Sequence, residues 1–221
     1  IQSPTTLTVA VRLDMDKGWH TYWRNAGDAG MPTKIDWKLP DGFTAGSIRW
    51  ALPEKLYFSD NAEYSYENAT LLLAEIKAPD NINKNEVKLT ADVNWLMCKE
   101  KCIPGSAVIA LTLPVKNREP EINKKWAVAF EETMKALPAK TDKLNFEAHK
   151  DDSGVYLKII PKENITIGSK LQFYPYENGI FCNGCEQKII KQDNGYLLEI
   201  PYAQFKIEEP DSLKGILVSK D

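Results

Sequence analysis

The feature that most constrains this fold is the recurrence of apolar residues at every second position in several short segments. These segments lie within residues 1–115, and turn-rich stretches separate them. Such an alternation places apolar side chains on one face of an extended strand, where they can pack on a core. Several short strands separated by turns favour an antiparallel sandwich. The alternating segments are Leu7, Val9, Val11 and Leu13; Ile35, Trp37 and Leu39; Val87, Leu89, Ala91, Val93 and Trp95; and Ile109, Leu111, Leu113 and Val115, while residues 69–78 form another apolar run.

Residues 116–140 have a different pattern, because their apolar residues recur at helical spacing up to Pro138, which cannot continue a helix. Residues 141–221 return to alternation and predict further strands. We therefore expect a β-sandwich domain over 1–115, a linker with one amphipathic helix over 116–140, and a second, smaller β domain over 141–221. The helical apolar residues are Ile122, Trp126, Phe130, Met134 and Leu137, and the later alternating ones are Val155, Leu157 and Ile159; Leu171 and Phe173; and Tyr196, Leu198 and Ile200.

Composition narrows the function classes. The 221 residues carry 28 basic and 31 acidic side chains, a net charge of −3, without a block of Lys or Arg that would indicate nucleic-acid binding. The longest apolar runs are far shorter than the roughly 20 residues that a membrane span needs. Because the chain opens on a polar segment, we expect a processed or trimmed chain from a longer protein.

The four cysteines form two close pairs, and the first is Cys98 and Cys102. Close pairs indicate redox chemistry or metal ligation rather than a spread-out disulfide framework. In an extended chain, the Cα atoms of residues four apart would lie roughly 13 Å apart, whereas a disulfide needs about 4.4–6.8 Å. If these cysteines bond, the strand must therefore break into a turn. The exposed part of that turn would be Lys99-Glu100-Lys101, and Pro104-Gly105 would end it.

Two lysines beside this pair would stabilise a thiolate, the reactive form of cysteine, and Glu100 would oppose them. A disulfide that closes so small a loop gives limited chain-entropy stabilisation, so a partner thiolate could open it easily. The alternatives are a purely structural disulfide or two buried thiols.

Several sequence segments are distinctive when taken together. They are Gly18-Trp19-His20-Thr21-Tyr22-Trp23-Arg24-Asn25, Gly27-Asp28-Ala29-Gly30-Met31-Pro32-Thr33, Trp37, Leu39-Pro40-Asp41-Gly42-Phe43 and the run from Trp95 to Pro104. In these segments the chain resembles the amino-terminal periplasmic region of DsbD-family thiol:disulfide interchange proteins, and the ScsB-like branch is the closer match. The resemblance covers residues 5–115 well and the remainder loosely.

The resemblance implies an immunoglobulin-like β-sandwich in the periplasm of a Gram-negative bacterium, as part of an inner-membrane protein. It implies a protein-disulfide reductase module in which Cys98 and Cys102 take electrons from a membrane-embedded domain of the same parent protein. The pair would pass them to oxidised periplasmic proteins, including thioredoxin-like ones, without metal or organic cofactor. It further implies that Cys102 forms the intermolecular bond and that Cys98 resolves it.

The resemblance also implies a mobile cap loop that shields the cysteines with an aromatic side chain. Its equivalent here is the segment from Tyr57 to Tyr66, with Phe58 and Tyr64 as cap candidates and Asp60 or Glu63 as proton acceptors. The alternative is an ordinary exposed loop whose aromatics are anchored in the core. For His20, a packed structural role is favoured over one in tuning a thiolate.

The second pair, Cys182 and Cys185, flanks Asn183-Gly184. Asn-Gly is a strong signal for a two-residue hairpin turn, which would place these cysteines opposite each other with Cα atoms about 5.5 Å apart. The pair could clip the hairpin, act as a second redox relay or ligate a soft metal, in that order of preference.

Two further classes of function compete with redox exchange. The two cysteine pairs could together bind zinc or copper(I), and copper is relevant because the ScsB-like branch is associated with copper tolerance. The chain could also be a non-catalytic adhesion or assembly domain that its disulfides brace.

Overall fold

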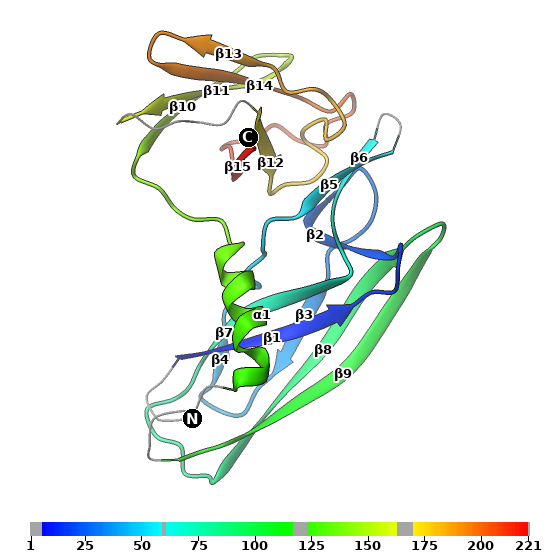
Figure 1. Ribbon diagram of the computed structural model, residues 1–221, viewed down its shortest axis with the longest axis vertical. Helices are drawn as coiled ribbons and strands as arrows, with labels where there is room; N and C mark the ends of the chain where they lie inside the picture. The colour runs from blue at the N-terminus through cyan, green and yellow to red at the C-terminus, as the bar shows by residue number, and fades with distance from the viewer. Residues whose placement is uncertain (1–5, 59–60, 117–122, 163–169, 221) are drawn as a thin grey trace. The chain divides into compact units, whose positions relative to one another are not determined.

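The structure, a computed structural model, describes residues 6–58, 61–116, 123–162 and 170–220. It is mainly β with antiparallel strand pairing and one short helix, which confirms the predicted fold class of an immunoglobulin-like sandwich with further β structure (Figure 1). None of the helices among these residues is long and apolar enough to cross a membrane. The elements are β1 (Thr6–Asp14), β2 (His20–Gly27), β3 (Lys34–Lys38), β4 (Thr44–Ala45), β5 (Glu54–Phe58), β6 (Asn61–Glu67), β7 (Ala69–Lys77), β8 (Glu86–Cys98), β9 (Cys102–Pro114), α1 (Lys124–Lys135), β10 (Leu144–Lys150), β11 (Gly154–Pro161), β12 (Lys170–Pro175), β13 (Ile189–Gln192), β14 (Gly195–Pro201) and β15 (Gly215–Lys220).

The chain divides into two compact units, and neither is continuous in sequence. Unit 1 comprises Ile1–Arg24, Met31–Glu54 and Ser65–Pro138, and unit 2 comprises Asn25–Gly30, Lys55–Tyr64 and Ala139–Asp221. Strands β2, β5 and β6 therefore contain residues of both units. The predicted boundaries 1–115, 116–140 and 141–221 stay a prediction of domain limits, and the two short segments that unit 2 takes from the amino-terminal half were not foreseen.

One antiparallel sheet, of order β1-β7-β4, belongs to unit 1. The other runs β3-β8-β2-β6-β5, with β9 paired to β8, and its strands β3, β8 and β9 belong to unit 1. Strands β1 and β8 confirm the period-two prediction, because their buried positions alternate, whereas β7 is buried continuously from Thr70 to Ala74. Burial of each such large aliphatic side chain stabilises the fold by about 1.5–3 kcal/mol. The buried core residues on these strands are Val9, Val11, Leu72, Ala74, Ile76, Val87, Leu89, Ala91 and Val93.

Helix α1 confirms the helix predicted within 116–140. Asn123 is its N-cap, and the Asn123 side chain accepts a hydrogen bond from the Lys125 amide at 3.1 Å. None of the residues of α1 is fully buried, but Trp126 is half-buried and lies under the guanidinium of Arg12, 5.4 Å from the ring centroid. The helix therefore packs on unit 1 through one side only.

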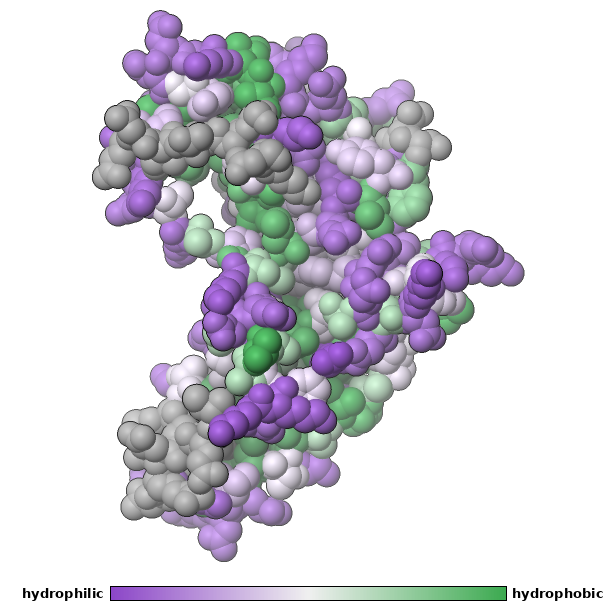
Figure 2. Space-filling view, in the orientation of Figure 1, coloured by the Kyte–Doolittle hydropathy of each residue, from purple (hydrophilic) through white to green (hydrophobic). Residues whose placement is uncertain are grey.

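Strand β9 departs from the expected half-burial. Val108 is 71% exposed, Ile109 39% and Leu111 47%. The reason is that β8 is the only strand that β9 pairs with in the described part of the chain, so β9 is an edge strand. Figure 2 accordingly shows hydrophobic side chains among hydrophilic ones along the β8–β9 hairpin, with hydrophilic side chains gathered at its turn.

Unit 2 contains a four-stranded sheet of order β10-β11-β14-β13 and a two-stranded sheet of β12 and β15. The turns Asp152-Ser153-Gly154 and Asp193-Asn194-Gly195 join β10 to β11 and β13 to β14. The core lies among these sheets and the loop between β12 and β13. It consists of Val155, Leu157, Ile159, Leu171, Phe173, Ile180, Phe181, Leu198 and Ile200.

Asp28 fixes the segment Asn25–Gly30 within unit 2. One Asp28 carboxylate oxygen accepts a hydrogen bond from the Ala62 amide at 2.7 Å, and the other accepts one from the Asn183 side chain at 2.8 Å. Asn25 is 1% exposed, and its side chain donates to the Pro175 carbonyl at 2.9 Å. Buried polar groups such as these are costly unless they are paired, so these bonds specify how three distant segments of sequence meet.

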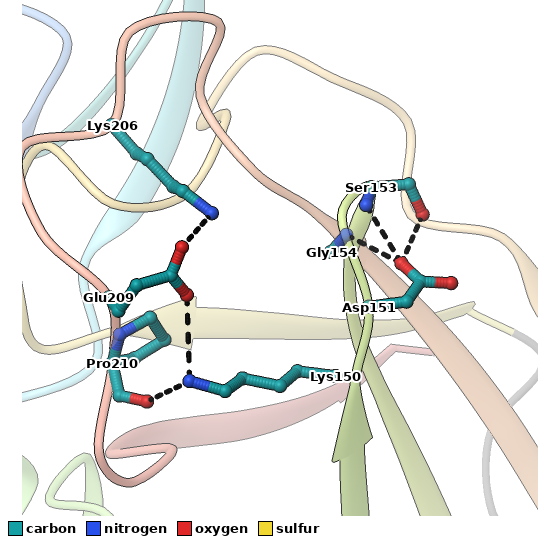
Figure 3. Close-up of polar contacts among 7 residues, drawn as sticks. All are labelled: Lys150, Asp151, Ser153, Gly154, Lys206, Glu209 and Pro210. Carbon is teal, nitrogen blue, oxygen red and sulfur yellow. Dashed lines mark hydrogen bonds and ion pairs between the residues drawn. The ribbon is translucent and has the colours of Figure 1, made fainter.

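The β10–β11 turn is held by one carboxylate. Oδ1 of Asp151 accepts hydrogen bonds from the Ser153 amide at 2.8 Å, the Ser153 hydroxyl at 2.7 Å and the Gly154 amide at 3.2 Å (Figure 3). These bonds favour the charged form, so the bonds from Ser153 lower the pKa of Asp151 below its ordinary value.

Glu209 ties the loop before β15 to the end of β10. Lys206 forms an ion pair with Oε1 of Glu209, while Lys150 lies 3.5 Å from Oε2 and donates to the Pro210 carbonyl at 3.3 Å (Figure 3). The hydrogen bond from Lys206 lowers the pKa of Glu209, with a smaller contribution from Lys150.

Two local predictions were wrong. Pro104-Gly105 does not end the excursion after Cys98, because both residues lie inside β9. Asn183-Gly184 does not form a hairpin turn, because residues 182–188 lie outside any strand. The Asn183 side chain is 3% exposed and bonds to Asp28, so tertiary contacts override the local turn preference.

Gly27 is a position where unit 2 tolerates only glycine. Its φ is +91°, and a Cβ there would clash with the carbonyl of Ala62. We expect Gly27→Ala to lower the free energy of unfolding by about 2–4 kcal/mol, measured by denaturant titration. Gly46→Ala is the matched control, because a Cβ at Gly46 would meet nothing closer than 3.5 Å. Equal losses from the two variants would contradict this account.

The pKa of Glu209 is also testable. In a carboxyl-carbon NMR titration, Glu209 should titrate below its ordinary value of 4.5, and Lys206→Met should raise that midpoint more than Lys150→Met does. At pH values above the pKa of Glu209 in the unfolded chain, its ion pair with Lys206 stabilises the loop. This contribution is lost as the pH falls through the lower pKa of Glu209 in the folded protein. An unchanged midpoint in Lys206→Met would contradict the assignment.

Candidate functional site

The register of the β8–β9 hairpin brings the first cysteine pair together. The two strands pair along their whole length, from Glu86 opposite Pro114 to Cys98 opposite Cys102. Cys98 and Cys102 are disulfide-bonded, with Cα atoms 4.1 Å apart. The chain reverses between them through Lys99, Glu100 and Lys101, the turn that the distance argument required. The disulfide therefore closes the turn end of a long hairpin.

The two cysteines differ in exposure. Cys98 is 4% exposed, whereas Cys102 is exposed. Exchange requires a thiolate to approach one sulfur of the disulfide, so access decides which sulfur is attacked. The structure therefore presents one accessible cysteine and one that is protected behind it.

Two buried residues of β2 lie at the protected side of this pair. His20 is 6% exposed and stands opposite Cys98 in the β2–β8 register. Tyr22 is fully buried, and its hydroxyl lies 3.9 Å from Cys102 Sγ, within range of a weak O–H···S hydrogen bond. The two rings meet edge to face at 5.3 Å. Tyr22 is a site residue that sequence reasoning did not single out, although it belongs to the segment that carries the family resemblance.

The turn lysines differ in their contacts. Lys99 Nζ donates to the Lys17 carbonyl at 3.3 Å. The Lys99 side chain also packs beside Gly18, whose φ is +80°. Lys101 is exposed. The expected effect of these lysines on a thiolate stays a prediction.

A surface pocket of about 290 Å³ lies beside the cysteine end of the hairpin. Met97 and Ile103, the residues next to the two cysteines, face each other across the strands and line it. Successive side chains of a strand point to opposite faces, so this pocket and the cysteine side chains lie on different faces. Gly105 permits the arrangement, because a Cβ there would clash with the ring of Trp95, another lining residue.

The four cap-loop candidates belong to unit 2. Phe58 ends β5 and is 48% exposed, and Glu63 is half-buried on β6. Tyr64 is fully buried, with its ring 4.8 Å from that of Tyr174. Burial raises the pKa of Tyr64 far above its ordinary value, so its phenol stays neutral. Asp60 lies outside the described residues. A capping role for these residues stays a prediction.

The second cysteine pair is in unit 2. Cys182 and Cys185 are disulfide-bonded, with Cα atoms 5.3 Å apart. The described residues contain no group of three or more His, Cys, Asp or Glu side chains placed to hold a metal ion. Each cysteine has its own pair partner, and the two pairs belong to different units.

Comparison with known proteins places the chain in a family. The family described as "Thiol:disulfide interchange protein DsbD, N-terminal" matches residues 2–114, just over half of the chain and the whole cysteine hairpin. The chain therefore belongs to the family of DsbD amino-terminal domains, and the resemblance noted in the sequence is confirmed. A search of curated protein sequences gave no match.

A solved structure shares the fold over nearly the whole chain. The N-terminal periplasmic domain of ScsB from Proteus mirabilis matches with a TM-score of 0.70, covering 99% of this chain and 85% of that one. The sequence identity is 13%, so this likeness shows a common fold. In fold, the chain is ScsB-like, and the likeness extends past residue 114 into the region that the family match does not cover.

The Tyr22 hydroxyl gives a prediction for the reduced protein. A hydroxyl hydrogen bond would favour the reactive thiolate, so removing it by Tyr22→Phe should slow alkylation of the reduced Cys102 at neutral pH by about three- to tenfold. The measurement is the pH dependence of iodoacetamide alkylation in a Cys98→Ser background. Tyr66→Phe is the matched control, because Tyr66 donates to the Ala51 carbonyl at 2.7 Å. An unchanged pH profile in Tyr22→Phe would contradict a role for this hydroxyl.

Proposed function

We propose that this chain is a thiol:disulfide exchange module that works through the Cys98–Cys102 couple. The observation that carries the proposal is the asymmetry of that disulfide, which joins an exposed Cys102 to a Cys98 that is 4% exposed. Membership of the DsbD amino-terminal family supports thiol–disulfide chemistry as the class of activity.

The asymmetry supports a defined order of steps. A thiolate of a reduced partner attacks Cys102 Sγ, the bond to Cys98 breaks, and Cys98 leaves as a thiolate that takes up a proton. The partner's second thiol then attacks its own sulfur in the mixed disulfide and releases Cys102. The partner has become a disulfide, and Cys98 and Cys102 have gained two electrons and two protons.

The second half of the cycle runs in the opposite direction. The Cys102 thiolate, with the Tyr22 hydroxyl 3.9 Å from its sulfur position, attacks the disulfide of an oxidised protein. Cys98 then resolves the mixed disulfide and restores the original bond. This order matches the roles that the family resemblance implies, with Cys102 intermolecular and Cys98 resolving.

Family membership supports a proposal for the partners and the location. We infer that the electron donor is a membrane-embedded domain of the parent protein, and that the acceptors are oxidised periplasmic proteins, including thioredoxin-like ones. The family match to DsbD and the fold shared with a periplasmic ScsB domain support this inference. The exposed side chain of Ile103, next to Cys102, offers apolar contact surface to such a protein.

The alternative function, a soft-metal site built from both cysteine pairs, has no specific observation in its favour. Both pairs are oxidised in the structure, and thiolates rather than disulfides bind metals. Zinc and copper analysis of reduced protein purified without chelator tests this alternative directly.

Trapping with single-cysteine variants tests the exchange proposal. With Cys182 and Cys185 replaced by serine, Cys98→Ser should accumulate reducible covalent adducts when expressed in a bacterial periplasm, because Cys102 stays exposed. Cys102→Ser should give at least about tenfold fewer, because access limits the attack of a buried thiol. Adducts are counted on non-reducing gels after rapid alkylation.

The control lacks all four cysteines and should give no adducts. Circular dichroism establishes that each variant keeps its fold. Comparable trapping by Cys98 and Cys102 would contradict the assigned roles, and an absence of adducts from the Cys98→Ser variant would contradict the exchange function.

A further inference from the structure

The loop that carries Cys182 and Cys185 is held in place by hydrogen bonds in addition to their disulfide. The Cys182 amide donates to the Pro201 carbonyl at 3.0 Å, and the Ala203 amide donates to the Ile180 carbonyl at 2.9 Å. Asn183, between the cysteines, bonds to Asp28. A disulfide across so few residues removes little entropy from the unfolded chain. This bond therefore contributes little to the stability of the fold.

The loop is fixed on the carboxyl-terminal side as well. The Gln187 side chain accepts a hydrogen bond from the Phe173 amide at 2.7 Å and donates one to the Phe173 carbonyl at 2.8 Å. With these two bonds, the Gln187 side chain pairs with the β12 backbone in the way that the backbone of a neighbouring strand would. Cys185 is therefore presented from a rigid frame, which suits a site that must meet a partner in one geometry.

The two sulfur-bearing residues differ in access. Cys182 is half-buried and adjoins the buried Phe181 and Asn183, whereas Cys185 is exposed. This repeats, in unit 2, the asymmetry of the Cys98–Cys102 pair, in which the first cysteine is protected and the second is open. An attacking thiolate would reach Cys185 first, and Cys182 would be the leaving group.

Cys185 also borders a surface hollow of about 330 Å³. This volume lies in the lower part of the roughly 300–1,000 Å³ range of small-ligand pockets. Its lining combines an exposed aromatic ring with charges of both signs and side-chain amides, which suits a peptide segment rather than an apolar molecule. These side chains belong to Tyr57, Lys170, Gln172, Glu186 and Gln187.

We propose that Cys182–Cys185 is a second thiol–disulfide exchange site, with the adjoining hollow receiving the dithiol-bearing segment of a partner protein. A thiolate of that segment attacks Cys185 Sγ, and the bond to Cys182 breaks. Cys182 leaves as a thiolate and is protonated. The partner's second thiol then displaces Cys185, so the partner gains a disulfide and this pair gains two electrons and two protons.

The test uses the full chain with Cys98→Ala and Cys102→Ala, so its outcome is independent of the first site. The protein is equilibrated in glutathione redox buffers without denaturant, and thiols are counted by mass-tag alkylation. The pair should be reduced at glutathione ratios that leave the fold intact, as circular dichroism shows. Two further variants each keep one cysteine of the pair. Cys185, left alone by Cys182→Ala, should form a mixed disulfide with glutathione about tenfold faster than Cys182, left alone by Cys185→Ala, because access governs the rate.

A second arm tests the hollow. Tyr57→Ala should slow reduction by a short synthetic Cys-x-x-Cys peptide several-fold and leave reduction by dithiothreitol unchanged, because only the peptide contacts the lining. Val128→Ala is the control, since Val128 is 62% exposed on α1 in unit 1. Resistance to glutathione until denaturant is added, or equal rates for the two single cysteines, would overturn the proposal. Equal slowing of both reductants by Tyr57→Ala would overturn the role of the hollow.

Discussion

The cross-strand register of β8 and β9 is the constraint on which the site depends. Thirteen consecutive residue pairs lead from Glu86 opposite Pro114 to Cys98 opposite Cys102. A slip of one residue would move Cys102 to the other face of the hairpin and leave the two sulfurs unable to bond. Burial of Val87, Leu89, Ala91 and Val93 fixes the face that β8 turns to the core. Gly105 of β9 fits this register, because it lies directly opposite Trp95 and any Cβ there would clash with the Trp95 ring.

The same hairpin protects one cysteine of the pair and leaves the other accessible to a partner. Strand β8 is covered by neighbours on both sides, since β9 pairs with one edge and β3 and β2 with the other. Strand β9 is an edge strand with exposed side chains. Cys98 is buried because it lies on β8, whereas Cys102 is exposed because it lies on β9. The difference between the two sulfurs therefore arises from sheet topology, and it gives the pair one point of attack.

Local patterns predicted the elements well and their tertiary roles less well. Alternation located β1, β3, β8 and β14, and the helix pattern located α1, because both reflect burial of one face. The hairpin turn predicted at Asn183-Gly184 was wrong, because a hydrogen bond from Asn183 to Asp28, 155 residues away in sequence, overrides the local turn preference. Tyr22 was missed for the same reason: its approach to Cys102 joins positions 80 residues apart. Contacts of this kind leave no local signal in a sequence.

The central claim is that Cys98 and Cys102 join and part reversibly in the folded protein. The most direct measurement is the equilibrium reduction potential of this pair in a Cys182→Ala, Cys185→Ala variant. An exchange-active couple should lie above about −300 mV, within reach of thioredoxin-like proteins. A value below about −300 mV, the range of disulfides that serve only to brace a fold, would contradict the account.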